Sequence, residues 1–253
     1  MRENRLKKIW KAGGTVYCGW LLGDSAYSAE VIANENFDAV VVDLQHGLFG
    51  FKEAVEMLQA ISTKAPVPLA RTPWNEPSPI QRLLDAGAWG VICPLVNNAD
   101  ECASFVGATR YPPDGERSFG PMRAMLYGGP DYYAKANSTI VTIAMIETAE
   151  ALDNLDGIMA VKGLDAVFIG PSDLSIALGH PPSLDPKHKE VLAAIERVRR
   201  TADAHGVVAG IHCADGRVAR KWRAKGFRFL PLAADSYYLA AGAKQMVAEA
   251  RKR

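Results

Sequence analysis

Five side chains that could perform catalysis stand at or just beyond the ends of short apolar runs: Asp43, His46, Arg71, Glu147 and Asp173. Two carboxylates from neighbouring runs can share a divalent ion, and hard oxygen ligands select Mg²⁺, Mn²⁺ or a similar ion over zinc. We therefore expect Glu147 and Asp173 to bind a divalent metal, with substrate and water completing its coordination. The alternative for either carboxylate alone is to cap a following helix, and Asp173 could cap one beginning at Leu174.

His46 is the candidate general base. It follows Asp43 by three residues, so the carboxylate could fix the tautomer of the imidazole and raise its basicity. A histidine followed by a glycine is also common in ordinary turns. Arg71 ends a run of the buried type, where a guanidinium needs an anionic partner. That partner is either the substrate or one of the nearby carboxylates.

Other residues are expected to surround the substrate. The turn Gly170, Pro171 and Ser172 leads into a short predicted helix, whose free amides and positive end could hold a substrate carboxylate. Such a Gly-Pro pair is also found in plain turns. Trp20 and His212 lie near the ends of two further apolar runs. We expect both in the wall of the pocket rather than in catalysis.

The apolar runs themselves predict the scaffold. Short β-branched or apolar runs alternate with segments of helical period, which is typical of a parallel sheet wrapped by helices. A chain of 253 residues has the usual length of an α/β barrel, in which active sites collect at the carboxyl ends of the strands. The eight strands are predicted at 16–22, 39–43, 67–71, 89–94, 140–146, 166–169, 207–211 and 227–232, and the main helices at 51–62, 78–85, 99–109, 187–205, 217–225 and 237–251.

We therefore predict one (β/α)₈ TIM barrel domain over residues 1–253. An open doubly wound sheet would show a similar alternation, but no GxGxxG follows the first predicted strand to favour a dinucleotide site. The segment from Tyr111 to Ser138 is too long and too rich in Gly and Pro for an ordinary turn. Because such loops are often functional, we expect it over the active-site mouth or against a neighbouring subunit.

Composition limits the partners. The 29 basic and 28 acidic residues nearly balance, which argues against a nucleic-acid or membrane-seeking surface. No stretch approaches the roughly 18 apolar residues that span a bilayer, and the charged amino-terminal segment is not of the signal-peptide type. We expect a cytoplasmic protein whose cysteines at 18, 93, 102 and 213 are reduced and structural. Its partners would be small molecules and copies of itself.

Five segments, in order and at compatible spacing, resemble one known family: FDAVVVDLQHG, ARTPWNEP, TRYPPDGERSFG, MIETAEALDNL and VFIGPSDLSIALG. The chain resembles the pyruvate-dependent class II aldolases of the 2,4-dihydroxyhept-2-ene-1,7-dioate and 2-dehydro-3-deoxyglucarate type over nearly its whole length. The resemblance implies an enzyme that joins the enolate of pyruvate to an aldehyde, or cleaves a 4-hydroxy-2-oxo acid. It also implies a hexamer, built as a trimer of dimers that exchange their last helix.

The same resemblance assigns roles to individual residues. Glu147 and Asp173 match the ligands of a Mg²⁺, Mn²⁺ or Co²⁺ ion, and the residue matching Arg71 stabilises the enolate oxygen. The residue matching His46, oriented by the match to Asp43, takes part in proton transfer. The backbone amides around Ser172 and Asp173 would receive the carboxylate of pyruvate.

Two positions depart from the pattern of this family. Met145 stands where a glutamine usually precedes the metal-binding glutamate, and a thioether cannot donate a hydrogen bond. Gln45 stands where glutamate is common, which reduces the negative charge near the base. These changes indicate altered substrate handling around Met145. Alternatives are a CoA-ester lyase or an oxaloacetate-type decarboxylase with related enolate chemistry, or a non-catalytic protein that binds keto acids.

Overall fold

The computed structural model describes residues 1–252. Eight parallel strands close into a barrel in the order β1-β2-β3-β4-β5-β6-β7-β8, which confirms the predicted (β/α)₈ fold. The strands are β1 (Val16–Leu21), β2 (Ala39–Asp43), β3 (Val67–Arg71), β4 (Gly90–Cys93), β5 (Val141–Ile146), β6 (Ala166–Ile169), β7 (Val208–Ile211) and β8 (Phe229–Pro231). Each lies within the range predicted for it from the sequence.

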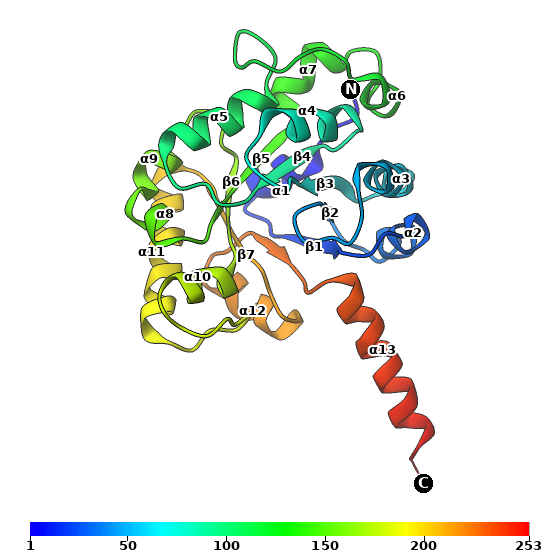
Figure 1. Ribbon diagram of the computed structural model, residues 1–253, viewed down its shortest axis with the longest axis vertical. Coiled ribbons are helices and arrows are strands. Elements are labelled where there is room, and N and C mark those ends of the chain that lie inside the picture. The colour runs from blue at the N-terminus through cyan, green and yellow to red at the C-terminus, as the bar shows by residue number, and fades with distance from the viewer. Residues whose placement is uncertain (253) are drawn as a thin grey trace.

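Helices surround the barrel (Figure 1). They are α1 (Arg5–Lys11), α2 (Ala26–Ala33), α3 (Phe51–Ser62), α4 (Pro77–Asp85), α5 (Ala99–Thr109), α6 (Met122–Gly128), α7 (Tyr132–Thr139), α8 (Ala149–Asp153), α9 (Leu155–Met159), α10 (Pro171–Ala177), α11 (Lys189–His205), α12 (Gly216–Ala224) and α13 (Asp235–Ala250). No helix in the described range is both long and apolar enough to cross a membrane.

Alternation along the strands separates two buried layers. In β5, Ile143 and Met145 belong to the cluster inside the barrel, whereas Ala144 and Ile146 belong to the cluster beneath the outer helices. A strand covered on both sides in this way is apolar along nearly its whole length, and in β5 Thr142 is the single exception. The first polar residue after the run therefore marks the end of the strand.

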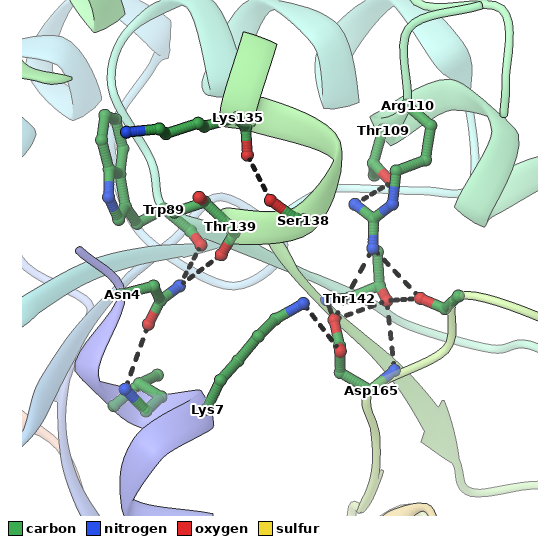
Figure 2. Close-up of polar contacts among 12 residues, drawn as sticks. Asn4, Lys7, Trp89, Thr109, Arg110, Lys135, Ser138, Thr139, Thr142 and Asp165 are labelled. Carbon is green, nitrogen blue, oxygen red and sulfur yellow. Dashed lines mark hydrogen bonds and ion pairs between the residues drawn. The ribbon is translucent and has the colours of Figure 1, made fainter. Parts of the chain in front are cut away.

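A polar network holds α1 against the amino-terminal end of the barrel. Figure 2 shows Lys7, Arg110 and Thr142 converging on Asp165. The carboxylate of Asp165 lies 2.9 Å from Lys7 Nζ and 3.6 Å from Arg110 Nη2, and it accepts a hydrogen bond of 3.0 Å from the amide of Thr142. Asn4 adds hydrogen bonds to the carbonyls of Trp89 and Thr139.

We expect Asp165→Ala to lower the free energy of unfolding by about 2–3 kcal/mol, because it leaves the Thr142 amide without its acceptor and the buried Arg110 without its anionic partner. Urea denaturation measures this loss. Asp156→Ala is the matched control, since its carboxylate is 86% exposed and, within residues 1–252, pairs only with His205, and it should change stability by less than about 0.5 kcal/mol. Equal effects of the two substitutions would contradict this role of Asp165.

The segment from Tyr111 to Ser138 does not lie over the mouth of this chain's own pocket, so the first of its two expected places is wrong, whereas contact with a neighbouring subunit stays a prediction. It contains α6 and nearly all of α7, and its Tyr127 and Tyr132 rings lie 4.5 and 5.6 Å from the ring of Trp89, just before β4. The amide of Arg2 also donates to the carbonyl of Gly128 at 2.7 Å. The segment therefore closes the amino-terminal end of the barrel, because the chain must return there from the end of α5 to begin β5.

The last helix, α13, projects away from the barrel (Figure 1). None of its residues is buried, although Leu239 and Met246 are large apolar side chains with exposed fractions of 77% and 68%. The helix therefore presents apolar surface without a covering element within the described part of the chain.

Candidate functional site

A pocket of about 340 Å³ opens at the carboxyl ends of the strands. Asp43 is the last residue of β2 and follows the inward-facing residues Ala39 and Val41. Arg71 is the last residue of β3 and follows the inward-facing residues Val67 and Leu69. The same two-residue alternation carries the inner face of β7 to His212 and that of β6 to Gly170. All but one of the predicted site residues line this pocket: Trp20, Asp43, His46, Arg71, Met145, Gly170, Pro171, Ser172, Asp173 and His212. The exception, Glu147, lies directly behind Gly170.

Asp43 and Arg71 form a buried two-point ion pair. Arg71 Nε donates to Oδ1 of Asp43 at 2.8 Å, and Arg71 Nη2 donates to Oδ2. Trp20 Nε1 donates to Oδ2 at 3.0 Å and the amide of Gln45 to Oδ1 at 3.0 Å. Burial by itself would raise the pKa of Asp43, but hydrogen bonds and charge from Arg71 outweigh it and the pKa is lowered. Asp43 is therefore an anion that fixes the guanidinium.

This arrangement differs from the expected pairing of Asp43 with the imidazole of His46. The carboxylate receives the backbone amide of His46 at 3.4 Å, while its oxygens are occupied by Arg71, Trp20 and the turn amides. The imidazole is absent from the hydrogen bonds of residues 1–252, and the His46 side chain is exposed to the pocket. Asp43 shapes the turn that carries His46 and orients Arg71 instead.

Glu147 follows β5 and is only 4% exposed. Its Oε1 accepts the amide of Leu95 at 2.9 Å. Burial is the largest influence on this carboxyl and, with a smaller contribution from the charge of Asp173, raises its pKa to about 7 against the opposing effect of the Leu95 hydrogen bond. A buried acid with this environment is typical of functional sites.

Gly170 lies between the two acidic side chains. An ideal Cβ built there would stand 2.6 Å from Oε2 of Glu147 and 3.4 Å from Oδ2 of Asp173. Both carboxylates therefore place an oxygen beside Gly170, and a side chain at this position would displace the carboxylate of Glu147. Gly170 is the N-cap of α10 and Asp173 is the third residue within that helix, so the alternative that Asp173 caps a helix beginning at Leu174 is wrong.

Two carboxylates are the whole acidic set available at this point. In residues 1–252, no three His, Cys, Asp or Glu side chains are grouped so as to hold a metal ion. An ion at this place would therefore take two protein ligands and leave its other positions to substrate and water, as Mg²⁺ commonly does.

The remaining predicted residues form one wall of the pocket. The guanidinium of Arg71 lies over the Trp20 ring at 4.9 Å, and Trp20 meets His212 edge-on at 5.3 Å. Burial, and to a lesser extent the charge of Arg71, lowers the pKa of His212 to about 4, so its imidazole is neutral at pH 7. Met145 places its sulfur 3.7 Å from Arg71 Nη1, where a thioether is a weak acceptor.

Two residues that shape the site, Leu95 and Asp235, were not predicted from the polar residues at strand ends. Leu95 has a φ of 53°, an uncommon conformation for a branched residue, and this turn aims its amide at Glu147. Asp235 accepts the amides of Leu22 and Gly23 at 3.0 and 3.1 Å, which holds the end of β1. The run Pro94-Leu95-Val96 shows no polar residue, whereas Asp235 follows β8 closely enough that the strand-end rule could have included it.

Residues 17–241 match the model of the HpcH/HpaI aldolase/citrate lyase family. The chain belongs to this family. Among its HpcH/HpaI relatives, the hydroxypyruvate/pyruvate aldolase of Rhizorhabdus wittichii is 45% identical over 98% of this chain and 99% of the relative. The 4-hydroxy-2-oxo-heptane-1,7-dioate aldolase of Salmonella dublin is 39% identical over 97% and 94%. A solved HpcH/HpaI family structure from Burkholderia cenocepacia has a TM-score of 0.92 and 32% identity, covering 98% of this chain and 100% of that one.

Family membership confirms the resemblance seen in the sequence. The chain is an HpcH/HpaI enzyme of the aldolase and lyase class, which makes or breaks carbon–carbon bonds. Its pocket is lined by the guanidinium of Arg71 and the carboxylates of Asp43 and Asp173, and the carboxylate of Glu147 lies beside it, next to Gly170.

Proposed function

We propose that this enzyme is a divalent-metal-dependent aldolase that removes a methyl proton from pyruvate and joins the resulting enolate to an aldehyde, or cleaves the corresponding 4-hydroxy-2-oxo acid. The observation that carries the proposal is the pair of carboxylates, Glu147 and Asp173, each of which has an oxygen beside Gly170. Arg71 lies close enough to influence the charge of Glu147 and lines the same pocket as Asp173. The names of the aldolase relatives support the same class of substrate.

The residues present fit a divalent ion. Glu147 and Asp173 would hold Mg²⁺, Mn²⁺ or Co²⁺, because both ligands are hard oxygens and because a cation would offset the cost of two neighbouring carboxylates, one of them buried. When bound, such an ion supplies Lewis-acid polarisation of the keto group of pyruvate.

The chain's own residues divide the remaining tasks. Arg71, held by Asp43, stabilises negative charge on the enolate oxygen. The first-turn amides of α10 at Ser172 and Asp173, which no side chain caps, bind the pyruvate carboxylate. Gly170 and Pro171 position that turn, while Trp20, Met145 and the neutral His212 form the wall and exclude water.

His46 moves the protons. In the synthetic direction it accepts a proton from the methyl carbon of pyruvate, and the resulting carbanion carbon forms a bond with the carbonyl carbon of the aldehyde. The alkoxide that forms then takes the proton back, so no net proton is consumed. The exposure of the imidazole to the pocket suits this exchange, because a proton carrier must reach the reacting atoms.

We also propose that the enzyme works as a homo-oligomer, a hexamer built as a trimer of dimers that exchange α13, with small keto acids and aldehydes as its other partners. The unburied apolar residues of α13 support this, and light scattering of the purified protein measures the mass. The four buried free cysteines support a reducing, cytoplasmic location. The near balance of charge supports the absence of nucleic-acid and membrane partners.

Glu147→Gln is expected to weaken Mn²⁺ binding by more than about a hundredfold, since even the loss of a hydrogen-bonding neighbour of a metal ligand costs 10- to 100-fold. Electron paramagnetic resonance of free Mn²⁺ measures affinity without reference to turnover. Glu150→Gln removes an exposed carboxylate three residues away and should leave the affinity unchanged. Wild-type affinity in Glu147→Gln would exclude Glu147 as a ligand and remove the main support for the proposed function.

A further inference from the structure

The pocket has two chemically different parts. Its ionic part is lined by Asp43, Arg71 and Asp173, at or just beyond the ends of β2, β3 and β6, and Glu147 lies behind Gly170 next to this part. The arc formed by the ends of β7, β8 and β1, together with the loop before α11, contributes mainly apolar lining residues: Leu22, Leu184, Ala214, Ala233, Ala234 and Tyr237. Pyruvate's polar atoms belong at the first part, so the second part is left for the other reactant.

We propose that the acceptor aldehyde of this enzyme is neutral and apolar, and that an aldehyde carrying a distal carboxylate is selected against by the arc from Leu184 to Tyr237. The inference rests on the proposed function and names the substrate class of the same site. It concerns the lining residues that distinguish one aldehyde from another.

The scarcity of positively charged side chains around the pocket supports selection against an aldehyde with a carboxylate. Among the described residues that line it, Arg71 is the only arginine or lysine. Two of its nitrogens are committed to Asp43, and the third faces Met145. His212, the imidazole nearest the apolar arc, is neutral at pH 7. A carboxylate placed against this arc would meet no cation among the lining residues, whereas an apolar chain there would cover Leu184 and Tyr237, which are 38% and 57% exposed.

The apolar arc is held in a fixed shape. Ala233 has a φ of 44° and donates its amide to the carbonyl of Cys213 at 2.8 Å, which ties the end of β8 to the residue pair after β7. Asp235 fastens the amides of Leu22 and Gly23. These contacts fix the backbone at Leu22 and Ala233, so this part of the wall keeps its apolar lining.

The test compares two aldehydes of equal chain length, butanal and 4-oxobutanoate, which differ at the far carbon by a methyl group against a carboxylate. With pyruvate and Mn²⁺, we expect kcat/KM for butanal to exceed that for 4-oxobutanoate by at least about tenfold, which is the lower range of discrimination by apolar contacts. Leu184→Arg should shift the ratio toward 4-oxobutanoate by at least about tenfold relative to Leu184→Gln, which adds a neutral polar group at the same place.

Equal use of the two aldehydes, or preference for 4-oxobutanoate by the wild-type enzyme, would overturn the inference. Exchange of the methyl protons of pyruvate with deuterium, measured without any aldehyde, separates this outcome from failure of the proposed function. Exchange together with preference for the acid would refute only the acceptor class. Absence of exchange would refute the proposed function and the acceptor class with it.

Discussion

Arg71→Lys is expected to slow enolate formation from pyruvate by about a hundredfold to a thousandfold, which is the usual cost of removing one positioned oxyanion donor. Arg71 donates to both oxygens of Asp43 through Nε and Nη2, and its Nη1 faces Met145 in the pocket. Lysine keeps the positive charge but has a single nitrogen, so it cannot make these contacts together. The rate is measured by deuterium exchange into the methyl group of pyruvate.

Mn²⁺ binding should be retained in this variant, because Arg71 is not an expected ligand. Arg82→Lys is the matched control, since Arg82 lies on α4 over the ring of Phe51 and outside the pocket. An Arg71→Lys enzyme with the wild-type exchange rate would show that the guanidinium is only a structural partner of Asp43.

Asp43→Ala should produce the largest loss of stability in the site, about 3–5 kcal/mol, the usual result of removing one member of a buried ion pair. Arg71, which is 8% exposed, would lose the carboxylate that balances its charge. The indole N–H of Trp20 would lose its hydrogen-bond acceptor. Urea denaturation at pH 7 measures the difference.

The double variant Asp43→Ala/Arg71→Met provides the control for this prediction. Removing both charges leaves no buried guanidinium without a partner, so the double variant should be less destabilised than the sum of the two single variants. Strict additivity would mean that Asp43 and Arg71 are not coupled, in conflict with their two-point contact.

The barrel could be predicted because its strands are buried on both faces. Such strands give continuous apolar runs, and β2, β3 and β6 begin and end at the predicted residues. The same alternation explains why polar residues at strand ends meet in one pocket. Asp43 and Arg71 lie at inward positions of their strands, and His212 continues the inward series of β7 just beyond its end.

The pairing within the pocket could not be predicted from spacing. Asp43 is close to His46 along the chain, but Arg71 is its neighbour across β2 and β3, in register with it. The Arg71 side chain reaches the carboxylate with two donors, whereas the His46 side chain turns into the open pocket. Tertiary proximity between adjacent strands outweighed sequence proximity.

The contribution of the backbone to the site could not be predicted for a different reason. Leu95 serves Glu147 through its amide, and an amide is present at every residue except proline, so no residue type marks it. One of the two places expected for the Tyr111–Ser138 segment, the active-site mouth, was wrong because its Gly and Pro content indicated an irregular connection but not its side of the barrel. The direction of travel from α5 to β5 decides that side.

The most direct test of the central claim is deuterium exchange at the methyl group of pyruvate, followed by proton NMR without an aldehyde. The wild-type enzyme with Mg²⁺ should exchange these protons, and an excess of chelator, or the substitution of Glu147 or Asp173 by its amide, should each abolish the exchange. Exchange that persists at the wild-type rate with chelator present and in both variants would contradict the proposal that these two carboxylates hold a catalytic ion.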